Sequence, residues 1–98
     1  MNIQNMQKNA EPALKLLKAL ANQNRLMILC HLLEGELTVG ELNQRVELSQ
    51  SALSQHLAWL RKDQLVMTRK ESQTIYYALA SKEAKAVLVQ LHDLYCAD

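Results

Sequence analysis

The fold of this chain is decided by residues 48–61, which read LSQSALSQHLAWLR. Leu53, Leu57 and Leu60 recur at the i, i+4 and i+7 spacing of one helical face, and this spacing predicts a buried stripe. Ser49 is a favourable N-cap residue, so a helix is expected from Ser49 to about Lys62. The other faces of this helix carry short polar or amide side chains.

A second helix is expected immediately before this stretch. Residues 38–41 read TVGE and match a capping box, in which the Thr hydroxyl and the Glu carboxylate each satisfy an N–H group at the helix end. The helix is predicted from Val39 to Val46, which leaves only residues 46–49 as a connection. A short helix, a tight turn and a second helix form a helix-turn-helix. Glu47 lies in this turn, where a glycine would be accommodated more easily.

The rest of the sequence predicts a single, mainly helical domain of 98 residues with a small hairpin. The expected helices span residues 9–21, with Pro12 in the first turn, residues 24–33, capped by Asn22 or Asn24, and residues 81–96. Two runs rich in β-favouring residues, 65–71 and 74–80, are joined by Ser72-Gln73 and predict a hairpin. The order helix, helix, helix, helix, strand, strand, helix is that of a winged helix-turn-helix.

The polar face of the helix beginning at Ser49 is free of acidic residues from Leu48 to Lys62. Glutamine can pair with adenine and serine can bond a base edge or a phosphate, while acids would be repelled by phosphates. The sequence therefore predicts contacts with double-stranded DNA, although a solubilising polar face is the alternative. The candidate contact residues are Ser49, Gln50, Ser51, Ser54, Gln55, His56, Arg61, Lys62, Arg69 and Lys70.

The net charge is only +1, so the distribution of charge is more informative than its sum. Residues 48–70 contain four cations and one acid, whereas residues 34–47 contain four glutamates and one arginine. Residues 1–8 are polar, unlike a signal-peptide core, and no apolar run reaches the length of a membrane span. We therefore expect a cytoplasmic protein without a membrane partner, in which Cys30 and Cys96 are reduced.

Residues 48–61 strongly resemble the ArsR/SmtB family of winged-helix regulators, and similar matches occur at residues 16–22, 25–30 and 74–77. The resemblance extends from about Ala13 to Cys96. It implies a homodimer that binds an inverted-repeat operator and pairs through the first and last helices. Spacing alone leaves open whether the apolar residues of those helices form core or interface. By resemblance the interface residues are Leu14, Leu17, Val87, Leu91 and Leu94.

Metal sensing, which is common in the family, is not favoured by these residues. The stretch that matches the arsenic- and lead-type site reads LTVGEL at residues 37–42 and lacks both cysteines. His31, His56 and His92 have no mutual spacing suited to zinc. We therefore expect neither a metal nor a cofactor, and a metal-responsive repressor is the less favoured interpretation.

The two cysteines allow different readings. Cys30 fits an apolar helical stripe with Leu26, Leu29 and Leu33 and would serve there as a small hydrophobe. The sequence is most similar to the HlyU/BigR/SqrR subgroup, and this similarity implies that Cys30 and Cys96 form a switch that detects persulfide or oxidants. The alternatives are a regulator or anti-silencer with structural cysteines, and a protein-interaction module that does not bind DNA. A small thiol-redox enzyme is disfavoured because no Cys-x-x-Cys motif or thioredoxin-like βαβ pattern is present, and the protein is not expected to be an enzyme.

Overall fold

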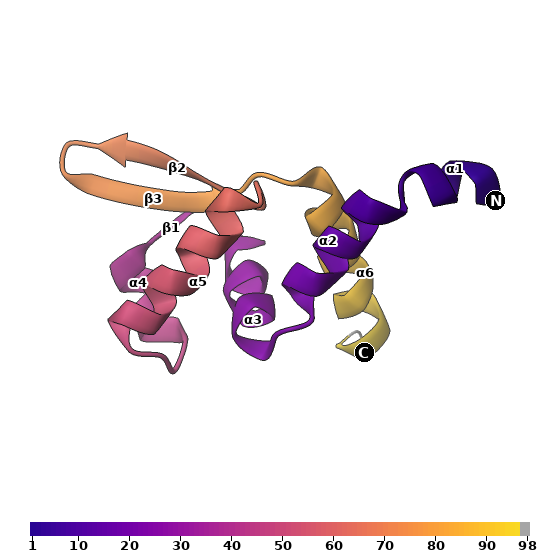
Figure 1. Cartoon of the computed structure of the whole chain (residues 1–98). Helices are drawn as coiled ribbons and strands as arrows, with labels where there is room; N and C mark the ends of the chain where they lie inside the picture. The colour runs from indigo at the N-terminus through magenta and orange to yellow at the C-terminus, as the bar shows by residue number, and fades with distance from the viewer. Residues whose placement is uncertain (97–98) are drawn as a thin grey trace.

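The computed structural model describes residues 1–96 and has six helices and three strands over that range (Figure 1). The helices are α1 (Ile3–Lys8), α2 (Ala10–Leu20), α3 (Gln23–Leu32), α4 (Val39–Arg45), α5 (Gln50–Lys62) and α6 (Lys82–Tyr95). The strands are β1 (Leu37–Thr38), β2 (Val66–Glu71) and β3 (Thr74–Leu79). The predicted winged helix-turn-helix is confirmed, with α4 and α5 as its two helices.

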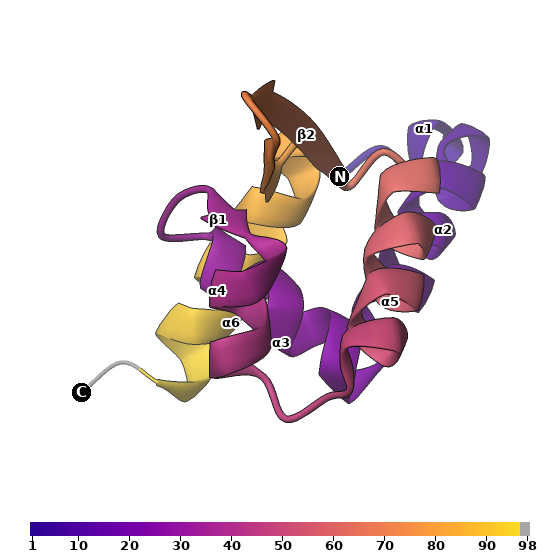
Figure 2. The same cartoon turned by 90° about the vertical axis from the view of Figure 1, so that its left-hand side faces the viewer.

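The hairpin β2–β3 and helix α1 project from opposite ends of the molecule in Figure 1. The hairpin extends beyond α4 and α5, while α1 continues outward past α2. Figure 2, turned to face the hairpin end, shows α4, α5 and the hairpin on this side of the molecule. Within residues 1–96, no helix combines the length and apolar character needed to cross a membrane.

The sheet contains one strand more than the sequence predicted. Its order is β1-β3-β2, with antiparallel pairs throughout. Strand β1 has two residues, Leu37 and Thr38, which pair with Tyr77 and Tyr76. A two-residue strand has no sequence periodicity of its own, which is why the pattern at residues 37–38 indicated only a helix start. The turn between β2 and β3 places Ser72 at φ 55°.

The predicted helix starts are confirmed by their hydrogen bonds. Of the two candidates for the α3 cap, Asn22 is the one used, and its Oδ1 accepts from the Arg25 N–H at 3.0 Å. Thr38 and Glu41 form the expected capping box, with distances of 3.1 and 2.9 Å. Ser49 accepts from the Ala52 N–H at 3.2 Å, which fixes the first turn of α5.

Helix α1 was not predicted from the sequence. Asn2 caps it by accepting from the Asn5 N–H at 3.1 Å, but none of its residues is buried. Ile3 and Met6 are 61% and 50% exposed. A six-residue helix without a buried face leaves no apolar periodicity to detect.

The core lies between the end of α2, helices α3, α4, α5 and α6, and the inner face of the sheet. For α3, the expected apolar stripe was displaced by part of a turn. The structure fully buries Ile28, Leu29 and Leu32, while Leu26 and Cys30 lie at the margin of the core. The helix packs against elements on more than one side, so a single stripe described it poorly. The complete buried set is Ala19, Leu20, Ile28, Leu29, Leu32, Leu37, Leu42, Leu53, Leu57, Leu60, Leu65, Val66, Ala84 and Leu88.

Candidate nucleic-acid interface

Helix α5 is anchored by the stripe predicted from its sequence. Leu53, Leu57 and Leu60 are at most 1% exposed. Burial of three leucine side chains contributes about 1.5–3 kcal/mol each to stability. The opposite face is open to solvent and carries the predicted contact residues Ser49, Gln50, Ser51, Ser54 and Gln55, all of them exposed.

The turn between α4 and α5 is held by a side chain that the sequence analysis did not single out. Asn43 Nδ2 donates to the Leu48 carbonyl at 2.8 Å and so spans the connection. Glu47 fits this turn without strain, because the positive φ angles in residues 1–96 belong to Gly35, Gln64 and Ser72. The position of Asn43 just before a tight turn could have predicted this bond from the sequence, because Asn side chains commonly bond nearby backbone groups.

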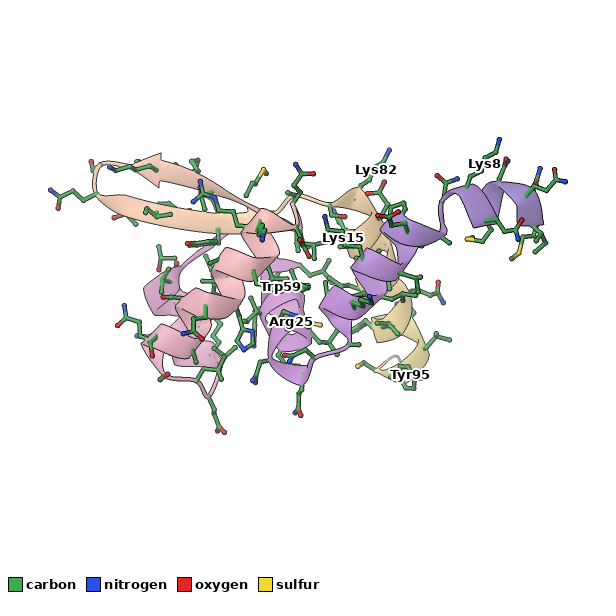
Figure 3. All side chains as sticks on the ribbon, in the orientation of Figure 1. Lys8, Lys15, Arg25, Trp59, Lys82 and Tyr95 are labelled. Carbon is green, nitrogen blue, oxygen red and sulfur yellow. The ribbon has the colours of Figure 1, made fainter. Side chains whose placement is uncertain are left out.

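A second unpredicted residue, Arg25, connects the start of α3 to two other helices. Its Nε and Nη2 atoms donate at 3.0 Å to the carbonyls of Ala19 and Lys18 at the end of α2. Its guanidinium also lies 4.2 Å from the centroid of the Trp59 ring on α5. Both residues are labelled in Figure 3. Arg25 therefore links α5 to the end of α2. A lone arginine and a lone tryptophan 34 positions apart give no sequence signal of this contact.

The C-terminal half of α5 meets the base of the hairpin. Arg61 and Lys62 are exposed, as predicted, and His56 is half-buried. A shallow hollow is lined by Ser54, Ala58, Arg61 and Lys62 of α5 together with Tyr77 of β3. Asp63 is the only acidic residue between positions 48 and 70, and it forms an ion pair with Lys15 at 3.6 Å.

Arg69 and Lys70, the predicted contacts of the hairpin, have different surroundings although both are exposed. Arg69 is engaged by Glu36 at 2.6 Å and Glu71 at 2.7 Å. Its guanidinium also lies 4.4 Å from the Tyr76 ring centroid. Lys70 forms no ion pair with any of residues 1–96. The guanidinium hydrogen bond lowers the pKa of Glu36 below its usual value of 4.5.

The two cysteines are both free thiols, one half-buried and one exposed. Cys30 lies on α3, and Cys96 is the C-cap of α6, where its N–H donates to the His92 carbonyl at 2.7 Å. Burial raises the pKa of the Cys30 thiol, and the nearby Cys96 raises it further. The two members of the sequence-predicted pair therefore have unequal access to solvent.

The apolar residues predicted for a dimer interface divide into two groups in the single chain. Leu14, Leu17 and Leu94 are 53%, 54% and 66% exposed, so they are not part of this chain's core. Val87 and Leu91 are half-buried. Tyr95, at the far end of α6 in Figure 3, is also largely exposed.

Among residues 1–96, no group of three or more His, Cys, Asp or Glu side chains could hold a metal ion. The surface described so far consists of a polar helix face, a hairpin and exposed leucines on α2 and α6. In sequence, residues 22–68 match the family model of bacterial regulatory proteins of the arsR family. Relatives more than 30% identical also match this chain over nearly its whole length. The chain belongs to the arsR family.

Two relatives illustrate the position of the chain within the arsR family. The transcriptional activator HlyU of Vibrio cholerae is 65% identical over 96 residues, which is 98% of this chain and 89% of HlyU. A structure of reduced HlyU aligns with a TM-score of 0.88 at 64% identity, covering 95% and 98% of the two chains. The repressor BigR of Xylella fastidiosa aligns over the whole of both chains, with a TM-score of 0.92 and 39% identity.

A more distant arsR-type domain, from Mycobacterium bovis, is described as a homodimeric winged helix-turn-helix DNA-binding domain. It aligns with a TM-score of 0.79 at 26% identity and covers 90% of this chain and 82% of that domain. Together these similarities identify the chain as a transcriptional regulator with a DNA-binding winged helix-turn-helix.

Proposed function

We propose that this regulator reads double-stranded DNA with the exposed face of α5. The observation that carries the proposal is the acid-free polar face formed by Ser49, Gln50, Ser51, Ser54 and Gln55, on a helix whose other face is locked into the core. Such side chains can bond base edges in a major groove, which is wide enough to admit a helix. The regulator works in the cytoplasm, where bacterial DNA lies.

The remaining predicted contacts surround this face. Arg61 and Lys62 at the end of α5 are exposed cations suited to phosphate oxygens. His56 is half-buried and would contact DNA with only part of its ring. The hairpin lies on the same side of the molecule as α5 and would reach the adjoining backbone or minor groove (Figure 2).

The proposal includes a homodimer on an inverted-repeat operator. Support comes from the exposure of Leu14, Leu17 and Leu94 in the single chain, because a second copy that covered these side chains would remove apolar surface from water. The half-buried Val87 and Leu91 would complete the interface. A two-fold dimer presents two α5 helices, which would meet half-sites about one helical turn of DNA apart.

We further propose that Cys30 and Cys96 form a thiol switch that responds to persulfide or oxidants. With a low-molecular-weight persulfide, the exposed Cys96 thiolate attacks the outer sulfur, which yields a Cys96 persulfide and releases the small thiol. Cys30 then attacks the inner sulfur of Cys96, which forms the disulfide and releases hydrogen sulfide. The two protein thiols lose two electrons and two protons, and the sulfane sulfur is reduced. The resulting link between α3 and α6 would alter the spacing of the two α5 helices.

DNA binding is tested by selecting a duplex from a random library with the wild-type protein and then titrating that duplex. The expected result is an enriched inverted repeat whose affinity falls steeply as salt rises, because bound phosphates release counterions. Enrichment of no sequence, together with no salt-dependent binding, would exclude the proposal and favour a protein-interaction module.

The thiol switch is tested by mass spectrometry of the protein after treatment with glutathione persulfide, followed by a repeat of the titration. A Cys30–Cys96 link and a changed affinity are expected for the wild type, and neither for Cys96→Ser. The half-burial of Cys30 favours a second candidate, a regulator with structural cysteines. Identical responses of the wild type and Cys96→Ser would establish that candidate instead.

A further inference from the structure

Arg69 is placed where a DNA contact was expected, but all three nitrogens of its guanidinium already donate to carboxylates of the protein. Nε and Nη2 donate to the two carboxylate oxygens of Glu36 at 3.2 and 2.6 Å, and Nη1 donates to Glu71 at 2.7 Å. Its plane is stacked near Tyr76. One guanidinium with two carboxylates carries a net charge of −1, which repels a phosphate rather than binding it.

The strand register places the side chains of Arg69 and Lys70 on opposite faces of the sheet. Arg69 is paired with Tyr76, and Lys70 with Ile75. Because successive side chains of a strand point to opposite faces, Arg69 and Tyr76 share one face of the sheet, and Lys70 shares the other with Tyr77. Tyr77 lines the hollow that includes Ser54 of α5. Lys70 therefore lies on the sheet face that meets α5, and Arg69 lies on the face turned away from it.

The Arg69 contacts also connect parts of the chain that are distant in sequence. Glu36 lies just before β1, whereas Arg69 is on β2, and β3 runs between these two strands. The arginine thus reaches across β3 to the opposite edge of the sheet. Exposed ion pairs usually contribute little to stability, but a bidentate arginine–carboxylate pair has the geometry that is most effective.

We propose that Arg69, held by Glu36 and Glu71, positions the wing, and that Lys70 is the phosphate contact of the wing. The proposal rests on the proposed DNA binding through α5, and it reassigns one of the two hairpin cations. Arg69 affects DNA binding by orienting the hairpin β2–β3, and Glu36 and Glu71 neutralise its charge in the free protein. Lys70, which has no carboxylate partner within residues 1–96, keeps its full charge for the DNA backbone.

Salt dependence distinguishes a phosphate contact from a positioning residue. The selected duplex is titrated at several salt concentrations with the wild type, Lys70→Gln, Arg69→Gln and Glu36→Gln, and circular dichroism confirms that each variant is folded. Lys70→Gln is expected to reduce the slope of log affinity against log salt by about 0.9, the effect of one phosphate. Arg69→Gln should lower the affinity and leave the slope unchanged.

Glu36→Gln is the matched variant, because it breaks the same contact without removing a cation. It should reproduce the loss of affinity seen for Arg69→Gln, and the double variant should lose no more than either single one. A slope reduced by about 0.9 in Arg69→Gln would overturn the proposal. So would a higher affinity and steeper slope for Glu36→Gln, since Arg69 would then have been released to a phosphate.

A titration of the free protein tests the Arg69–Glu36 contact independently of DNA binding. In the wild type, NMR titration of the Glu36 carboxyl carbon should give a midpoint below 4.5, because Arg69 lowers that pKa. In Arg69→Gln the midpoint should rise. If the wild type binds no DNA, the proposed function fails, and equal midpoints in the two proteins would overturn the Arg69–Glu36 contact itself.

Discussion

Cys30 is half-buried and Cys96 is exposed, and we expect this difference in exposure to set the order in which the two thiols react. The thiolate is the nucleophilic form of cysteine. Burial, followed by the effect of Cys96, raises the pKa of Cys30 above its usual value of 9.0, so this thiol stays protonated at neutral pH. Cys96 is exposed and meets small reagents first.

Alkylation rates test this order. With iodoacetamide at neutral pH, peptide mass spectrometry should show Cys96 modified well before Cys30. The Cys30 rate should rise with pH to a midpoint above 9.0. Cys96→Ser should lower that midpoint only slightly, since burial is the larger cause. Faster modification of Cys30 than of Cys96 would contradict this order.

The helices and strands of this chain were predictable where apolar side chains recur at a helical or strand spacing, or where a capping residue marks a helix start. The leucine stripe of α5 and the caps at Thr38 and Ser49 are local patterns, and they predicted the helix-turn-helix correctly. Helix α1 and strand β1 are too short for any period to develop. The sequence therefore predicted the helices and the hairpin that build the site. It missed a short helix at the opposite end of the molecule (Figure 1) and a two-residue strand at the edge of the sheet.

Contacts between elements were the part of the site that local patterns did not predict. Arg25 meets Trp59, and Glu36 meets Arg69, across more than 30 positions of sequence. No spacing rule relates residues so far apart, so Arg69 was taken for a free cation. The exposure of the polar α5 face, by contrast, followed directly from the burial of the opposite leucines.

Removal of the Arg25 contact should loosen the packing of α2, α3 and α5. Arg25→Met retains an apolar stem but loses two hydrogen bonds to carbonyls and the contact with Trp59. We expect a loss of about 1–3 kcal/mol in the free energy of unfolding, measured by urea denaturation. Arg45→Met, at an exposed position on α4, is the control and should change it by about 0.5 kcal/mol or less. Equal effects of the two substitutions would exclude a bridging role for Arg25.

At the scale of the whole molecule, the proposed homodimer would explain the exposed leucines of α2 and α6, because a second copy of the chain would cover them. A charge placed in a buried apolar interface is strongly unfavourable unless it is paired. Leu17→Glu and Leu94→Glu should therefore shift the protein toward the monomer in sedimentation velocity and weaken its binding to the inverted repeat. Met67→Glu replaces an equally exposed apolar residue on the wing and should leave the oligomeric state unchanged. A wild-type protein that sediments as a monomer at the concentrations that bind DNA would contradict the dimer.

The central claim is that the exposed face of α5 reads the DNA sequence, and the most direct test is the specificity ratio of a variant of that face. The ratio compares the affinities for the selected duplex and for a scrambled duplex at one salt concentration. For Gln50→Ala with Ser54→Ala, we predict that it falls tenfold or more, because each lost base contact costs about 1–3 kcal/mol. Gln90→Ala, an exposed glutamine on α6, should keep the wild-type ratio. A wild-type ratio in the folded double variant would show that α5 does not read the sequence.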